Sequence, residues 1–374
     1  MKILFFTFFF PRITETFIIN KIISLLKQGV DVQIMAMADP SKHKAVEDRK
    51  PEKIIHSDVF KYNLLERTTY IKMINDKPDY RTIKQYFLKN NLDLVHFQWS
   101  GLADWILSKI DFSMPVITNF HESVIPKNWP RKVDEFQTIF TKSSLILPVS
   151  IFIKNHLQEQ GCPTPKLQTH HMGVDINMFK VTKQIKKANE IVFLTVAGLL
   201  EKKGHQDALR VMKKIKDQGV NFKYYIVGDG VLREKLEKFV EDNNLQKNVI
   251  FTGKIVQQKV LKYYHKSHIF IHPSVTASDG SHEGIPTTIM EASACELPII
   301  STIHTGIPEL VIDGKTGFLS REHDIEKMTQ DALILVKNTA LRKRMGKAGR
   351  RIVVRYFNVD KLTLKAIQIY KSYI

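Results

Sequence analysis

The chain has 374 residues, 43% of them hydrophobic, which suffices to bury more than one core and favours two domains over one. Its two cysteines, Cys162 and Cys295, are far apart and form no Cys-x-x-Cys pair, which argues against a disulfide framework or thiolate metal site and favours a reducing cytoplasm. The formal net charge of +18 attracts anions, whether nucleotides, anionic lipid head groups or nucleic acids. A solvated, lysine-rich surface explains this charge equally well.

Membrane-crossing segments are not predicted. The apolar start at residues 1–10 resembles a signal peptide, but no small-residue cleavage site follows it. No uninterrupted apolar run approaches the roughly 18 to 20 residues that cross a bilayer. Attachment to a membrane surface stays open.

The first half alternates apolar runs of strand length with stretches of helical period, which is the βαβ pattern of a parallel sheet. Residues 38–90 are charge-rich and irregular, and their elements cannot be assigned. The pattern predicts strands at residues 3–7, 30–36, 92–97, 115–120 and 145–149, with helices at 15–27, about 103–109 and 151–160.

A second alternating series follows a break at residues 173–190, which is typical of an interdomain connection. It predicts strands at residues 191–197, 223–227, 249–252, 269–272 and 298–302, with helices from about 204, 231, 257 and 287. We therefore expect an α/β protein with two Rossmann-like, doubly wound parallel-sheet domains. The expected boundaries are 1–172, 173–190 for the connection, 191–355, and 356–374 for a C-terminal helix that packs back on the N-terminal domain.

The strongest local pattern is a pair of carboxylates, Glu283 and Glu291, that straddle a predicted helix start. Pro286 suits the first helical turn, and the backbone N–H groups near Gly284 and Ile285 would form a cradle for a diphosphate. In this geometry Glu283 would bind sugar hydroxyls and Glu291 ribose hydroxyls. Acidic residues near a helix start are common, so the spacing alone favours an ordinary helix terminus with a solvated Glu291.

Two further loops follow predicted strands of the second half. Lys203 comes after the strand at residues 191–197, where ligands of open parallel sheets bind, and would neutralise a phosphate. Gly228 belongs to a Gly-Asp-Gly turn that lacks the third glycine of a dinucleotide fingerprint, which disfavours a hydride-transfer enzyme. A solvated lysine and a simple tight turn remain the alternatives.

Histidines and carboxylates are the other candidate catalytic groups and metal ligands in the sequence. His121 follows the strand at 115–120 and would hydrogen-bond a sugar hydroxyl, although a lone histidine is usually a satisfied polar residue. His265, His268 and His272 cluster without carboxylate or cysteine partners, which argues against zinc. Because no Asp-x-Asp occurs, we expect lysines and helix N-termini, rather than a metal ion, to balance a diphosphate.

Taken together and in this order, the motifs resemble glycosyltransferase family 4, whose fold is GT-B, with two such domains that face each other across a cleft. The similarity is best over residues 173–317. It rests on Gly173-Val-Asp-Ile-Asn-Met-Phe179, the Lys-Lys-Gly turn, Gly228-Asp-Gly230, His272-Pro-Ser274, the Glu-x7-Glu segment and Gly314-Lys-Thr-Gly-Phe318.

The resemblance implies a role for each candidate residue. The catalytic residues would be His121 and Glu283, and the reaction would retain the anomeric configuration by front-face attack, without the carboxylate nucleophile of retaining glycosidases. A nucleotide-sugar donor would be bound by Lys203, Gly284, Ile285, Pro286, Thr287, Glu291, Gly228 and Arg12, and an acceptor by Glu122, Thr14 and Glu15. No cofactor or metal would be required.

Two departures from the family pattern stand out. Gly198 replaces the arginine that usually binds the diphosphate, so this contact is weaker or comes from elsewhere, for instance from Arg12. The usual glycine pair of the first loop is replaced by Phe10-Pro-Arg-Ile-Thr-Glu-Thr-Phe17, which is similar to the exopolysaccharide-building branch of the family.

The expected function is hexose transfer from a UDP-sugar, or secondly a GDP-sugar, to a polyprenyl-linked or lipopolysaccharide acceptor at the inner membrane face. Binding to an anionic lipid surface would be favoured by the basic charge, the stretch Asn128-Trp-Pro-Arg-Lys132 and the tip Phe8-Phe-Phe10. Local packing explains these features equally well. The alternatives are a non-hydrolysing sugar-nucleotide epimerase or phosphorylase on the same fold, and a non-catalytic nucleic-acid or anionic-surface binding protein. No nucleic-acid module is visible, so no nucleic-acid partner is expected.

Overall fold

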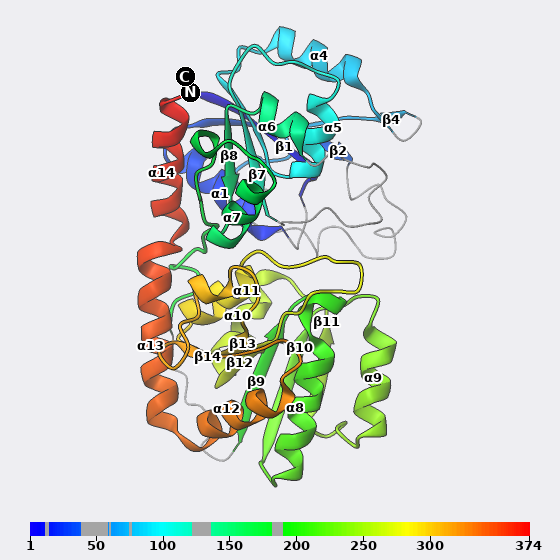
Figure 1. The fold of residues 1–374 in the computed structure, drawn as a ribbon, viewed down its shortest axis with the longest axis vertical. Coiled ribbons are helices and arrows are strands. Elements are labelled where there is room, and N and C mark those ends of the chain that lie inside the picture. Colours follow the sequence, from blue (N-terminus) through cyan, green and yellow to red (C-terminus); the bar gives the residue numbers. More distant parts are fainter. Residues whose placement is uncertain (12–14, 39–58, 60, 75–76, 122–135, 182–189) are drawn as a thin grey trace. The chain divides into compact units, whose positions relative to one another are not determined.

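The computed structural model of the protein describes residues 1–11, 15–38, 59, 61–74, 77–121, 136–181 and 190–374. They form two compact units (Figure 1), which are treated separately. Unit 1 consists of residues 1–173 and 359–374, and unit 2 of residues 174–358. Each unit is built on a six-stranded sheet whose paired strands all run parallel.

The sheet of unit 1 has the strand order β3-β2-β1-β6-β7-β8. Its strands are β1 (Lys2–Phe9), β2 (Asp31–Ala38), β3 (Thr68–Tyr70), β6 (Leu94–Phe97), β7 (Val116–Phe120) and β8 (Leu145–Pro148). The helices are α1 (Thr16–Lys27), α4 (Tyr80–Lys89), α5 (Ser100–Leu107), α6 (Gln137–Lys142), α7 (Ile151–Glu159) and α14 (Val359–Lys371), and a small hairpin joins β4 (Met73–Ile74) to β5 (Lys77–Pro78). A 3-10 turn, η3, spans Thr164–Lys166.

Helices cover both faces of this sheet, which is why its central strands are continuous apolar runs rather than alternating ones. On one face, α1 and α14 pack over β1 and β6, with Ile22 and Tyr370 in the core. On the other face, α5, α6 and α7 bury residues such as Ile106 and Ile153. Between the two helices of the first face, the Ser24 hydroxyl donates to Asp360 Oδ1 at 2.7 Å.

The sheet of unit 2 has the order β11-β10-β9-β12-β13-β14. Its strands are β9 (Ile191–Val196), β10 (Phe222–Val227), β11 (Val249–Gly253), β12 (Ile269–His272), β13 (Ile299–Thr302) and β14 (Gly317–Ser320). The helices are α8 (His205–Asp217), α9 (Arg233–Asp242), α10 (Gln257–Lys266), α11 (Thr287–Ala294), α12 (Ile325–Lys337) and α13 (Thr339–Tyr356), with 3-10 turns η4 (Glu201–Lys203) and η5 (Ile307–Glu309).

Both sheets have the strand order of a doubly wound nucleotide-binding fold, so the predicted pair of Rossmann-like sheets is confirmed. The order reverses between β1 and β6 in unit 1 and between β9 and β12 in unit 2. Ligands of such sheets bind beside the carboxyl ends of the strands at these reversal points. The loops that follow β9 and β12 are therefore where a site is expected in unit 2.

Some details differ from the sequence-based expectations. Pro286 takes the N-cap position of α11, one residue before the helix, rather than its first turn. Phe10 is only 1% exposed and belongs to the core of unit 1, so the aromatic tip is packed at that residue. The stretch at residues 128–132 lies outside the described residues. In the part of the chain that the structure covers, no helix has the length and apolar character needed to cross a bilayer.

Candidate active site

The loops after β9 and β12 are pressed together at the point where the strand order reverses. Gly204 ends the turn η4 with a φ of +66°, a conformation that favours glycine. A Cβ atom at this residue would lie 1.7 Å from the carbonyl oxygen of Pro273, in the loop after β12. This close approach holds Lys203, the residue before Gly204, at the carboxyl edge of the sheet.

Lys203 forms a buried ion pair with Glu283. Its Nζ donates to Glu283 Oε2 at 2.8 Å, and Lys202 Nζ lies 4.0 Å from the other carboxylate oxygen. Burial by itself would raise the pKa of Glu283, but the two lysines outweigh it and lower the pKa to about 2. Glu283 is therefore ionised at neutral pH, and its Oε1 accepts no hydrogen bond from any described residue.

A histidine and a second carboxylate fix the backbone at Glu283. The Glu283 N–H donates to Nε2 of His304 at 3.2 Å, so the ring proton is on Nδ1, which donates to Glu322 Oε1 at 2.6 Å. Glu322 also accepts from the N–H of Thr276 at 2.8 Å. None of these three partners was predicted from the sequence, because nothing in their spacing indicates that they meet.

The start of α11 offers unpaired backbone donors, as predicted. Among the described residues, the N–H groups of Gly284, Ile285 and Thr287 have no hydrogen-bond acceptor. They precede or begin an eight-residue helix, whose dipole places partial positive charge at this end. The Gly284 carbonyl is held by the Thr305 hydroxyl at 2.9 Å. The arrangement can bind an anion such as a diphosphate.

Glu291 is buried rather than on a solvated face, with 6% of its surface exposed. Its Oε2 accepts from the Tyr264 hydroxyl at 2.7 Å, and its Oε1 accepts from the Gln257 amide at 3.0 Å. Burial raises the pKa of Glu291 to about 7, against the opposing effect of these two hydrogen bonds. Tyr264 and Gln257 both come from α10 and were not predicted as site residues.

His272, at the end of β12, is a further residue that the sequence did not single out as functional. It is fully buried, and neither ring nitrogen has a hydrogen-bond partner among the described residues. Burial, with a smaller effect of Lys203, lowers the pKa of His272 to about 3, so the ring is neutral. Its position at the end of a predicted strand was the signal that could have identified it.

The other two histidines of that cluster have separate structural partners. His265 contacts the Lys180 carbonyl at 2.9 Å, and His268 Nδ1 accepts the N–H of Val192 at 3.0 Å. Throughout the described ranges, no group of three potential metal ligands comes together.

Two glycines near β9 and β10 have opposite spatial requirements. Gly228 has a φ of +148°, and a Cβ there would lie 1.8 Å from the Ala197 carbonyl oxygen, so the close approach of the two loops requires glycine. At Gly198 a Cβ would meet its nearest neighbour, the Asp229 carbonyl oxygen, at an ordinary 3.7 Å. The structure therefore has room for a Cβ atom at Gly198.

The remaining candidates belong to unit 1. His121 follows β7 and lies between two aromatic rings, with centroid distances of 4.9 Å to Trp99 and 5.0 Å to Phe17. Burial lowers the pKa of His121 to about 3, so this ring is also neutral. Glu15 is buried at the N-cap of α1. The predicted residues Arg12, Thr14 and Glu122 lie outside the described residues.

Comparison with solved structures identifies the fold, which is that of GT-B glycosyltransferases. The chain superposes over its full length on a glycosyltransferase from Rickettsia africae with a TM-score of 0.77 and 19% identity, covering 98% of that chain. It superposes equally on Anabaena HepE in complex with UDP and glucose, with a TM-score of 0.77, 17% identity and complete coverage of both chains.

Sequence comparison gives the family. Residues 14–178 match the family model described as Glycosyltransferase Family 4, and residues 178–352 match Glycosyl transferases group 1. The chain belongs to glycosyltransferase family 4. It is 29% identical to the putative colanic acid biosynthesis glycosyltransferase WcaL of Escherichia coli, over 88% of this chain and 89% of that protein. It is also 29% identical to the amylovoran biosynthesis glycosyltransferase AmsK of Erwinia amylovora, over 91% of this chain and 92% of that protein.

Proposed function

We propose that this glycosyltransferase is a metal-independent, retaining enzyme of exopolysaccharide or lipopolysaccharide biosynthesis. It transfers a hexose from a UDP-sugar, or secondly a GDP-sugar, to a lipid-linked or surface-glycan acceptor. The observation that carries the proposal is the ionised Glu283, paired with Lys203 beside the free N–H groups at the start of α11. The names of WcaL and AmsK support the pathway, and UDP in the HepE structure supports the choice of base.

Three groups of residues in unit 2 each bind a different part of the nucleotide-sugar donor. The diphosphate accepts hydrogen bonds from the N–H groups at the start of α11 and pairs with the ammonium of Lys203. These groups supply positive charge without a metal ion. The hydroxyls of the transferred sugar donate to Oε1 of Glu283, which accepts no hydrogen bond from a described residue. The ribose hydroxyls contact Glu291, whose carboxylate is held in place by Tyr264 and Gln257.

Retention follows from attack on the same face from which the nucleotide leaves, with a donor phosphate oxygen accepting the acceptor proton. His121 of unit 1 has a neutral ring, which can hydrogen-bond a sugar hydroxyl. Glu15 takes part in acceptor binding. The net charge of +18 favours a peripheral position on an anionic membrane, where lipid-linked acceptors are found.

The test is a panel of UDP-, GDP-, ADP- and dTDP-sugars with the purified protein in EDTA. Thermal stabilisation and slow donor hydrolysis are followed together, because a ligand of the native state raises its melting temperature. One responding donor, hydrolysed without metal, is expected. Glu283→Gln and Lys203→Ala should each abolish hydrolysis, whereas Lys235→Ala, which removes an exposed lysine of α9, should not.

Unchanged hydrolysis in the Glu283 and Lys203 variants would refute the assignment of the site. Product analysis separates the other activities of this fold, since an epimerase needs no acceptor and a phosphorylase consumes phosphate. No response to any nucleotide sugar would favour the non-catalytic binding protein, for which the missing arginine at Gly198 is the specific observation.

A further inference from the structure

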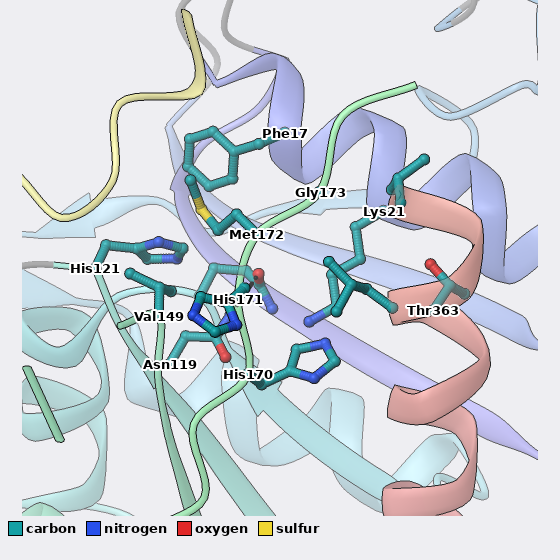
Figure 2. A pocket seen from close by; sticks show the side chains of 13 residues that line it. Phe17, Lys21, Asn119, His121, Val149, His170, His171, Met172, Gly173 and Thr363 are labelled. Carbon is teal, nitrogen blue, oxygen red and sulfur yellow. Dashed lines mark hydrogen bonds between the residues drawn. The ribbon is translucent and has the colours of Figure 1, made fainter. Parts of the chain in front are cut away.

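Unit 1 contains a pocket at the carboxyl ends of β6, β7 and β8, closed on one side by α1 and α14 (Figure 2). Its enclosed part has a volume of about 20 Å³. A single water molecule requires about 10 to 15 Å³ measured in this way. The pocket therefore accepts one oxygen-sized group, while the rest of a ligand would lie outside it.

Lys21 of α1 lines this pocket, and no described residue is its anionic partner. Its side chain keeps some exposure at the surface, but the ammonium end is enclosed and points toward Asn119 and His170 (Figure 2). The one favourable contact recorded within the described residues is with the ring of Phe5, whose centroid is 5.7 Å from Nζ. No carboxylate of the described chain is within ion-pair distance. A buried ammonium is stabilised by a charged partner or else loses its proton, so an anion bound here would pair with Lys21 and keep it charged.

A chain of buried hydrogen bonds ends in the same pocket. Asn119 Oδ1 can only accept, so His96 Nε2, at 3.0 Å, carries the ring proton. His96 is neutral because burial lowers its pKa well below the usual value, and its Nδ1 therefore accepts from the Tyr370 hydroxyl at 2.8 Å. Asn119 Nδ2 in turn donates to Gln98 Oε1 at 3.2 Å.

All of these hydrogen bonds are donated in the same direction along the series, from Tyr370 through His96 and Asn119 to Gln98. The last donor, Gln98 Nε2, is buried and has no acceptor among the described residues. Hydrogen bonds in a chain polarise one another, which strengthens the donor at its end. The pocket thus combines an ammonium without a described anionic partner and a polarised amide N–H, and no described group accepts a hydrogen bond from either.

We propose that this pocket binds one anionic oxygen of the acceptor, from a carboxylate or a phosphate group. An anionic oxygen would accept from both Lys21 and Gln98, and the opening at the strand ends is where α/β sheets present ligands. His121 also lines the pocket, so an acceptor anchored here lies beside that residue. The assignment of the anion to the acceptor rests on the proposed glycosyl transfer, whereas the pocket and its donors do not.

The experiment measures binding of acetate and of inorganic phosphate to the full chain at constant ionic strength, from thermal stabilisation. Acetamide and trimethyl phosphate are the neutral counterparts. The variants are Lys21→Met, the control Lys84→Met, which removes an exposed lysine of α4, and Lys203→Met, which removes the proposed phosphate ligand of unit 2. Donor hydrolysis is followed on the same preparations.

We expect Lys21→Met to weaken binding of at least one anion about ten- to hundredfold, as loss of a charge-assisted hydrogen bond does. Binding that survives in Lys84→Met and Lys203→Met belongs to the pocket of unit 1. A preference for phosphate indicates a phosphorylated, lipid-linked acceptor, and a preference for acetate indicates an acidic sugar.

Two results would overturn the inference: neither anion binds more tightly than its neutral counterpart, or Lys21→Met leaves both affinities unchanged. If Lys21→Met does not fold, Gln98→Leu is judged by the same criteria. Donor hydrolysis without Lys21-dependent anion binding would remove this inference alone. Lys21-dependent anion binding without any donor hydrolysis would preserve the pocket and remove the proposed function.

Discussion

Replacing Lys203 by methionine should destabilise unit 2 by leaving Glu283 buried without its closest cation. The carboxylate is 7% exposed, and Lys202, with Nζ 4.0 Å away, is the remaining described cation at ion-pair distance. With the nearer lysine gone, the effect of burial prevails and the pKa of Glu283 should rise toward or above its ordinary value of 4.5. The variant then loses the stabilisation that an ionised, paired Glu283 provides.

The size of the effect follows from proton linkage. The pKa of Glu283 is about 2 in the folded protein and 4.5 when unperturbed. Because the folded value is the lower one, the carboxylate stabilises the fold above pH 4.5, and this contribution is lost as the pH falls toward 2. At 1.36 kcal/mol for each tenfold change in proton affinity, the contribution at pH 7 is about 3 kcal/mol, and near pH 3 it is less than half of that.

Urea unfolding of four proteins at pH 7 and pH 3 measures this effect: wild type, Lys203→Met, Glu283→Gln and the double variant. We expect the Lys203→Met loss to be largest at pH 7 and the double variant to be more stable than the sum of the single changes predicts. Lys235→Met is the control for loss of a lysine charge. A Lys203→Met cost below about 0.5 kcal/mol at pH 7, or strict additivity, would refute the buried pair.

Four other changes test separate parts of the structure. Burial lowers the pKa of Lys21 from 10.5 to about 7, so between these pH values the unfolded chain holds a proton that the folded chain releases. The urea midpoint of unfolding should therefore rise between pH 7 and 10, and Lys21→Met should flatten that rise. Burial raises the pKa of Glu291 from 4.5 to about 7, so the contribution of this residue to stability falls as the pH rises through that range. In the same urea assay, Glu291→Gln should remove the fall in stability between pH 5 and 8. Gly198→Arg should tighten donor binding by about tenfold in a direct titration, because the position accepts a Cβ atom without overlap and a guanidinium pairs with phosphate. Unchanged affinity would contradict this. Gly228→Ala should lower stability by more than about 3 kcal/mol in thermal unfolding, because its Cβ would overlap a carbonyl oxygen; a small loss would show that the loops can separate.

The sequence predicted the sheets well because a strand buried between two layers of helices is a continuous apolar run. β1, β9 and β12 are such runs, and the residues after β9 and β12 could be placed at the same edge of one sheet from the βαβ pattern alone. The final strand β14 and the helices α12 and α13 were not predicted. Residues 38–90 could not be assigned, and their described part includes the short strands β3, β4 and β5 and the helix α4.

The candidate site could be predicted only in part. Lys203 and Glu283 were each identified from a local pattern, but their pairing depends on β9 and β12 being neighbours, a long-range fact with no local sequence signal. The burial of Glu291 depends similarly on α10, which supplies both of its hydrogen-bond donors. The spacing placed the two carboxylates on either side of the start of α11, and packing determines the protonation state of each.

The helix α14 makes unit 1 discontinuous along the chain, and this affects the order in which the protein is assembled during synthesis. All of unit 2 leaves the ribosome before residues 359–374, so unit 2 can complete its core while unit 1 still lacks part of its own. Ala366 and Tyr370 then close that core, and Tyr370 also becomes the first donor of the hydrogen-bond chain through His96. A nascent chain that stops early therefore carries an exposed apolar face on α1 and an unorganised anion pocket, two features by which cellular quality control can distinguish it from the finished protein.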